Sequence, residues 1–130
     1  ADFILQNCCN VTENLHQLYR RVAFNIAICN TDDHFRNHGF LLTPKGWTLS
    51  PAFDMNPTLW HNQSLLINSV TNESDLDILL DSCEEYMINH NNAEKIIPEV
   101  KSAVAKWREV AVSLGIAKRE IDMFEQIFRA

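Results

Sequence analysis

Three oxygen-bearing side chains in the first half of the chain are spaced in a way that could support metal chemistry. Asp32 and Asn37 are five residues apart in the polar stretch "NTDDHFRNHGF", and Asp54 follows 17 residues after Asn37 in a proline-flanked segment. Carboxylate and amide oxygens suit Mg²⁺, which keeps several waters and takes phosphate oxygens from its substrate. If the intervening chain folds back on itself, Asn37 and Asp54 could hold the ion while Asp32 accepts a proton from an attacking hydroxyl.

This order of residues matches the phosphotransfer arrangement of protein kinases. There, a base Asp is followed five residues later by an Asn, and a metal-binding Asp comes further along. The spacing alone leaves a second interpretation open, in which Asp32 and Asn37 only cap turns, because Asp and Asn are common loop residues.

A metal hydrolase is a further alternative for the same stretch. His34 and His38 are four residues apart and would share one face of a helix, where Asp32 or Asp33 could add a ligand. Against it, Gly39 follows directly, and the stretch has the composition of a loop, where a spacing of four has no such meaning. Retained zinc would favour the hydrolase, and dependence on Mg²⁺ would favour the kinase.

Length and composition indicate one globular domain. The chain has 130 residues, of which 46% are hydrophobic, and a formal net charge of -6. Its basic pairs, Arg20/Arg21 and Lys118/Arg119, are isolated and are expected on solvated helix faces, so we expect no direct binding of nucleic acid.

The four cysteines contain no Cys-x-x-Cys motif, which argues against a zinc ribbon or a thioredoxin motif. Reduced thiols in a cytoplasmic protein are the simplest interpretation. No apolar run approaches 18 residues, so we expect no membrane span.

The elements expected to position these residues are mainly helical, with one small hairpin. Apolar residues at helical spacing predict a helix from Thr12, as N-cap, to Cys29. "GFLLT" and "GWTLS" on either side of Pro44-Lys45 predict a β-hairpin, and "QSLLINS" predicts a short strand or an extended loop.

The second half is expected to be helical. Ser74 is expected to cap a helix that continues to Met87, and a long helix is expected over 92–114, with Pro98 marking a kink or a restart. Gly115 is expected to end that helix, and 118–128 to form a last short one. The Met and aromatic side chains, together with inward positions such as Val110, are expected in the core.

The amino-acid sequence of the first half resembles that of a known family. "FNIAICNTDDHFRNHGFLL" followed by "GWTLSPAFDMNP" resembles the C-terminal kinase domain of HipA-like proteins, bacterial serine/threonine kinases that act as toxins in HipA–HipB toxin–antitoxin modules. "DLDILLDSCEEY" and "AVAKWREVAVSLGI" resemble the helical tail of the same domain, so the resemblance covers nearly the whole chain.

The resemblance implies a role for each residue of the constellation. Asp32 would be the catalytic base, and Asn37 and Asp54 would bind Mg²⁺ and, through it, ATP. His34 would either touch the transferred phosphate or position the loop. Asp54 is followed by Met55-Asn56 rather than Phe-Gly, so a regulated flip of that loop is not expected.

Smaller roles are expected for the neighbours of these residues. Asp33 would cap the loop or pair with a cation such as Arg36. Gly39 would supply a φ that other residues resist. Ser50 and Phe53 would orient the loop that holds Asp54.

The resemblance also implies partners and a missing part. A HipB-like antitoxin and a protein substrate, such as an aminoacyl-tRNA synthetase, would be the partners. With only Gly39, Gly46 and Gly115, the chain cannot form a glycine-rich phosphate loop. We therefore expect residues 1–130 to be a kinase C-terminal lobe without its nucleotide lobe, binding ATP weakly and transferring negligible phosphate unless another polypeptide completes it.

A non-catalytic interaction module is the alternative to a kinase lobe. In that case the fold would serve to dock an antitoxin or another partner protein. Exposed apolar surface where the missing lobe would sit could also drive self-association.

Overall fold

The computed structural model describes residues 1–58 and 62–128 and confirms a mainly helical fold with one two-stranded antiparallel sheet. In order, the elements are α1 (Asp2–Asn7), α2 (Val11–Ala27), the 3₁₀ turn η1 (Phe35–Asn37), β1 (Phe40–Thr43), β2 (Gly46–Leu49), α3 (Leu76–Asp81), the 3₁₀ turn η2 (Cys83–Tyr86), α4 (His90–Val104), α5 (Trp107–Ser113) and α6 (Lys118–Phe124).

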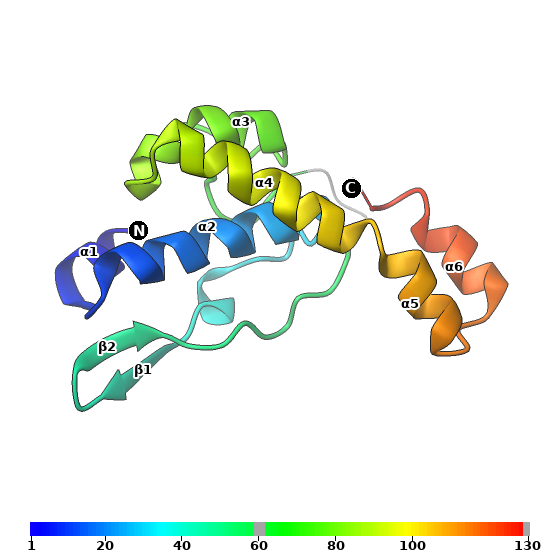
Figure 1. The fold of residues 1–130 in the computed structure, drawn as a ribbon, viewed down its shortest axis with the longest axis horizontal. Coiled ribbons are helices and arrows are strands. Elements are labelled where there is room, and N and C mark those ends of the chain that lie inside the picture. The colour runs from blue at the N-terminus through cyan, green and yellow to red at the C-terminus, as the bar shows by residue number, and fades with distance from the viewer. Residues whose placement is uncertain (59–61, 129–130) are drawn as a thin grey trace.

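Helices α2 and α4 lie side by side and form the body of the fold, with α3 beside them (Figure 1). The β-hairpin packs against α1 and α2. Helices α5 and α6 pack on each other and extend beyond the end of α4 (Figure 1). Within residues 1–58 and 62–128, no helix is both long and apolar enough to cross a membrane.

The core lies between α2, α3 and α4. Tyr19, Ala23 and Ile26 recur at intervals of four and three residues, which places them on one face of α2. This face packs with buried side chains of the later helices, including Leu79 and Ile96. The Tyr19 hydroxyl is also satisfied there, because it donates a 3.0 Å hydrogen bond to the carbonyl of Leu79.

The N-terminal region differs from the sequence-based expectation. The short helix α1 was not expected, and α2 begins with Asn10 as its N-cap rather than Thr12. Asn10 adopts a left-handed backbone conformation, with φ of 48°. The chain just before it is held to the hairpin by a 2.9 Å hydrogen bond from the Cys9 amide to the carbonyl of Trp47.

The helix expected to end at Met87 is shorter than predicted. Its N-cap is Asp75 rather than Ser74, because the Asp75 carboxylate accepts hydrogen bonds from the amides of Asp77 and Ile78 at 2.6 and 3.3 Å. α3 ends at Asp81, and η2 leads to Met87, which has a left-handed φ of 55°. Since Met87 is 65% exposed, its predicted place in the core is wrong.

The long helix predicted over 92–114 is divided into α4 and α5. α4 begins early, after the N-cap Asn89, and continues through Pro98, so the break is not at the proline. It comes at Ala105–Lys106, where the Lys106 amide reaches only three residues back, to Ala103.

Beyond this break, α5 takes its own direction. Trp107 packs edge to face on Phe128, with ring centroids 4.7 Å apart. Val110, predicted to face inward, is exposed, as is Met123 of α6. Gly115 ends α5 as expected, because its φ of 73° allows the Ile116 amide to reach the carbonyl of Ala111.

The hairpin is confirmed, and the segment after it is irregular. β1 and β2 pair with Phe40 opposite Leu49 and Thr43 opposite Gly46. The 63–69 segment forms no strand and is held instead by hydrogen bonds such as that from the Gln63 amide to the carbonyl of Asn72 at 2.8 Å. No disulfide joins the four cysteines, all of which lie in the described residues.

Asn14 joins α2 to its surroundings through four hydrogen bonds. Its side chain is 4% exposed. The Oδ1 atom accepts from the Leu49 amide at 2.6 Å and from the Thr48 hydroxyl at 3.0 Å, while Nδ2 donates to the carbonyls of Cys9 and Asn10. One amide therefore fixes both the hairpin and the start of α2.

We predict that Asn14→Ala lowers the free energy of unfolding by about 2–3 kcal/mol, because it leaves the buried Leu49 amide without its acceptor. Urea denaturation measures this loss. Asn91→Ala, on the exposed surface of α4, is the matched control and should change the same quantity by less than about 0.5 kcal/mol. Equal effects of the two substitutions would contradict the role given to Asn14.

Candidate functional site

The base of the hairpin brings the two predicted ligand-bearing loops together. The Ser50 amide donates a 2.8 Å hydrogen bond to the carbonyl of Gly39, so the chain enters and leaves the hairpin at one point. Asn37 lies two residues before Gly39 in the 30–38 loop, and Asp54 lies four residues after Ser50 in the 51–58 loop. The expected folding back of the chain is thus confirmed.

The same two loops are joined again at their other ends. The Thr58 amide donates to the carbonyl of Cys29 at 2.8 Å, and the Thr31 amide donates to the Thr58 hydroxyl oxygen at 3.0 Å. The 51–58 loop is therefore attached to the 30–38 loop at both of its ends.

A turn at Cys29 directs the chain from α2 into the 30–38 loop. Cys29 adopts a left-handed φ of 57°, and the Asn30 amide reaches back to the carbonyl of Asn25 at 2.7 Å. This is the hydrogen bonding of a Schellman helix end, which glycine usually provides. A non-glycine residue in this conformation stores backbone strain, and such strain is concentrated at functional sites.

A small pocket lies between the two loops and α2. It is lined by Arg21 and Asn25 of α2, by polar residues of the 30–38 loop and by residues 52–55. Both predicted Mg²⁺ ligands, Asn37 and Asp54, line it. The enclosed volume is about 10 Å³, close to the space that one water molecule needs.

Asp54 is held in a left-handed conformation, with φ of 56°. Its Oδ1 accepts a 2.9 Å hydrogen bond from the side-chain amide of Asn56. The carboxylate is exposed to solvent, which leaves it accessible to a cation.

The structure places Asp32 and His34 beside this pocket rather than in its lining. Asp32 is exposed, and its carbonyl accepts a 3.2 Å hydrogen bond from the Asn37 side chain. His34 is half-buried at the N-terminus of η1, and its carbonyl accepts from the Asn37 amide at 2.9 Å. Both residues thus hold Asn37 through their backbones, while their predicted catalytic roles stay predictions.

Asp33 pairs with His38 rather than with Arg36. His38 Nε2 lies 2.7 Å from Asp33 Oδ1, and the two side chains are only 12% and 9% exposed, whereas Arg36 is exposed. This pair engages one of the two histidines required by the hydrolase interpretation. Among the residues that the structure describes, no three His, Cys, Asp or Glu side chains cluster as metal ligands.

Arg21 is not on a solvated helix face, contrary to the sequence-based expectation. Its Nη2 donates to the carbonyl of Ser50, and Nη1 is buried without a hydrogen-bond partner among residues 1–58 and 62–128. Burial lowers the pKa of the guanidinium, and the nearby Asp33 carboxylate raises that pKa, which opposes the effect of burial. Arg20, its neighbour in sequence, does lie on the surface and pairs with Glu99 at 2.8 Å.

The residues present have the chemistry of a Mg²⁺ site, and the enclosed space suits a single small ion. Asn37 and Asp54 supply an amide oxygen and a carboxylate, the hard oxygen ligands that Mg²⁺ prefers. The buried Arg21 Nη1 at the same pocket is a charged N–H donor without a hydrogen-bond partner among the described residues.

Gly39 is required for close packing rather than for an unusual φ. Its φ is outside the left-handed region, so the reason given from the sequence is wrong. A Cβ at this position would lie 2.9 Å from Ser50 Oγ and 3.4 Å from Cε1 of Phe53. Gly39 thus lets the start of the 51–58 loop approach the hairpin.

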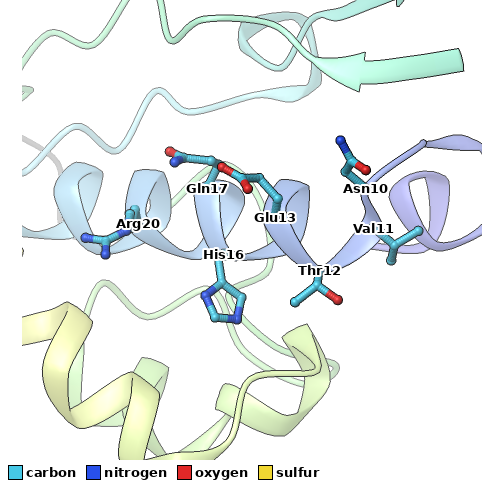
Figure 2. A pocket seen from close by; sticks show the side chains of 7 residues that line it. All are labelled: Asn10, Val11, Thr12, Glu13, His16, Gln17 and Arg20. Atoms are coloured by element: carbon cyan, nitrogen blue, oxygen red, sulfur yellow. The ribbon is translucent and has the colours of Figure 1, made fainter. Parts of the chain in front are cut away.

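A larger hollow lies elsewhere and contains none of these residues. Figure 2 shows it along the first half of α2, where Glu13, His16, Gln17 and Arg20 project from successive turns. It is an open surface hollow of about 710 Å³, and nearly all of its lining comes from a single helix. We place the candidate site at the smaller pocket because two loops and a helix converge there.

The contribution of α2 to the site was not expected from the sequence. Asn14, Arg21 and Asn25, at spacings of seven and four, lie on one face of the helix and form what we term the α2 polar stripe. All three contact the hairpin or the loops that it joins. Polar residues at helical spacing on an otherwise core-facing helix were the signal that could have revealed them.

We predict that Gly39→Ala lowers the free energy of unfolding by about 1–2 kcal/mol, because its methyl group collides with Ser50 Oγ. Adding Ser50→Ala removes that oxygen and should restore part of the loss, which denaturant unfolding of the two single variants and the double variant measures. Strictly additive losses would show that the contact with Ser50 is not the cause.

One known family matches the part of the chain that contains this pocket. No curated protein matches the chain. The family model described as "HipA-like C-terminal domain" matches residues 1–107, which contain α1 to α4 and both loops of the site. α6 and nearly all of α5 lie after the matched region. Because the match covers most of the chain, the protein belongs to the family of HipA-like C-terminal domains.

Proposed function

We propose that this chain is the catalytic C-terminal lobe of a HipA-like serine/threonine protein kinase, which transfers phosphate from ATP·Mg²⁺ to a protein hydroxyl. The observation that carries the proposal is the convergence of Asn37 and Asp54 on one pocket beside the loop of Asp32. Family membership supports the same assignment.

Each residue has a defined task in the proposed reaction. Asn37 and Asp54 bind Mg²⁺, which neutralises charge on the phosphates when it is bound. The Asp32 carboxylate orients a serine or threonine hydroxyl and takes its proton as the oxygen bonds to the γ-phosphorus and the bond to ADP breaks. His34 positions the loop or contacts the transferred phosphate.

The exposure of Asp32 supports this division of tasks. A base that serves a protein substrate must be reachable by a hydroxyl from another molecule, and Asp32 is exposed and lies outside the lining of the pocket. Its backbone is fixed through the bond from Asn37, so the base and the metal ligand keep their relative positions.

The same proposal includes four further parts. They are completion by a nucleotide lobe, a HipB-like antitoxin as partner, a protein substrate and a cytoplasmic location. These parts rest on family membership. Without the nucleotide lobe, we expect the chain to bind ATP weakly and to transfer negligible phosphate.

A non-catalytic docking module is the second candidate. Exposed apolar side chains on α1 and the hairpin favour it, since this much apolar surface on neighbouring elements is typical of a contact region. They are Phe3, Leu5, Leu41, Leu42 and Trp47. In that case the domain would bind a partner protein and need neither Mg²⁺ nor ATP.

Calorimetric titration of the chain with ATP, with and without Mg²⁺, distinguishes the two candidates. We predict weak binding that requires Mg²⁺ and is abolished by Asp54→Ala, because the carboxylate is a metal ligand. Asp32→Asn should bind as the wild type does, because a base is needed for transfer and not for binding.

Asp81→Ala, at the exposed end of α3, is the matched control for loss of a surface carboxylate and should bind as the wild type does. Absence of Mg²⁺-dependent binding to the folded wild type, or equal binding by Asp54→Ala, would contradict the kinase assignment and favour the docking module.

A further inference from the structure

Asp33 and His38 contact each other across the 3₁₀ turn η1, which carries Asn37. The 2.7 Å contact between His38 Nε2 and Asp33 Oδ1 spans η1, and both side chains are nearly buried. Exposed ion pairs contribute little to stability, but a buried carboxylate that loses its partner is strongly unfavourable. The pair therefore holds the turn in one geometry.

Arg21 attaches α2 to the start of the second loop and lines the same pocket as Asp33 and His38. Its Nη2 donates to the carbonyl of Ser50, the residue before the 51–58 loop. Burial lowers the pKa of the guanidinium, and the Asp33 carboxylate across the pocket raises that pKa. A guanidinium presents several N–H groups in a rigid plane, and here one of them holds the Ser50 carbonyl while Nη1 stays buried beside the pocket.

We propose that Arg21, Asp33 and His38 form a polar cluster whose task is to position Asn37 relative to Asp54. All three line the pocket that contains those two residues, with Asp33 and His38 paired within the 30–38 loop and Arg21 bonded to Ser50 at the start of the 51–58 loop. This inference rests on the proposed function, since it makes the three residues positioning residues for the predicted Mg²⁺ ligands.

The cluster would act on the metal through geometry. Groups behind the direct ligands of a metal orient those ligands, and their loss usually weakens metal affinity about 10–100-fold. Asn37 reaches the pocket from a three-residue turn and Asp54 from an irregular loop, so neither position is fixed by a regular element. The cluster supplies the constraint that a helix or strand would otherwise give.

Two measurements on the folded chain test this proposal. Amide hydrogen exchange at Asn37 and Ser50 reports on the two loops, with Val100 in α4 as the internal reference. Mn²⁺ binding, followed by electron paramagnetic resonance, reports on the metal ligands without ATP and without any activity.

We expect Arg21→Gln and His38→Leu each to raise exchange at both Asn37 and Ser50 at least tenfold more than at Val100. Each should also weaken Mn²⁺ binding about 10–100-fold. His38→Gln keeps an N–H group directed at Asp33 and should recover most of both losses. Recovery by this conservative variant separates positioning from a general loss of packing.

Arg20→Gln and His90→Gln are the matched controls, because both residues lie on the surface, with Glu99 and Glu94 as their partners. Neither control should change loop exchange or Mn²⁺ affinity.

The proposal is overturned if the two loops exchange no faster than Val100 in Arg21→Gln and His38→Leu. It is also overturned if the loops loosen while Mn²⁺ affinity stays unchanged, since the cluster would then only stabilise the fold. Failure of the proposed function would give a different result from failure of this inference. Asp54→Ala would then bind Mn²⁺ as tightly as the wild type does. In that case the exchange data alone decide whether the cluster couples the loops.

Discussion

The geometry of the site depends on the α2 polar stripe. Asn14 accepts a hydrogen bond from the Leu49 amide at the end of β2, Arg21 donates to the carbonyl of the next residue, Ser50, and Asn25 accepts from the side chain of Asn30 at 3.1 Å. The opposite face of α2 is anchored in the core through Tyr19, Ala23 and Ile26. One rigid helix therefore joins the best-packed part of the molecule to both loops of the site. Because those loops have little regular structure of their own, their placement follows from this helix and from the paired base of the hairpin.

Several local features here are unfavourable for stability, and together they distinguish a site from an ordinary turn. Cys29 and Asp54 hold left-handed backbone conformations that non-glycine residues avoid. Arg21 places charge in a partly buried region, where burial lowers the pKa of its guanidinium, and Asp33 is buried beside it in the same pocket. A loop that only connected α2 to the hairpin would need none of these. Left-handed residues also occur away from the site, at Asn10 and Met87, but in the described part of the chain only those around Asn37 and Asp54 accompany partly buried charge.

The sequence predicted the local features well and the distant pairings poorly. The hairpin followed from apolar runs around Pro44-Lys45, and the meeting of Asn37 with Asp54 followed from the hairpin. The pairing of Asp33 with His38 and the burial of Arg21 could not be derived, because each depends on how α2 packs against loops far away in sequence. The division of the long second-half helix was missed for a similar reason. No proline or glycine marks Ala105–Lys106, and the packing of Trp107 on Phe128 is a tertiary contact.

The central claim is that Asn37 and Asp54 hold one divalent cation between them. Paramagnetic broadening of the ¹⁵N-correlated spectrum by substoichiometric Mn²⁺ tests it most directly, since broadening falls steeply with distance from the ion. The account predicts that the Asn37 side-chain amide and the backbone amides of Asn37 and residues 53–55 disappear first, while the signals of α4 and α6 persist. Early broadening confined to acidic residues elsewhere on the surface, with the Asn37 and Asp54 signals intact, would contradict it.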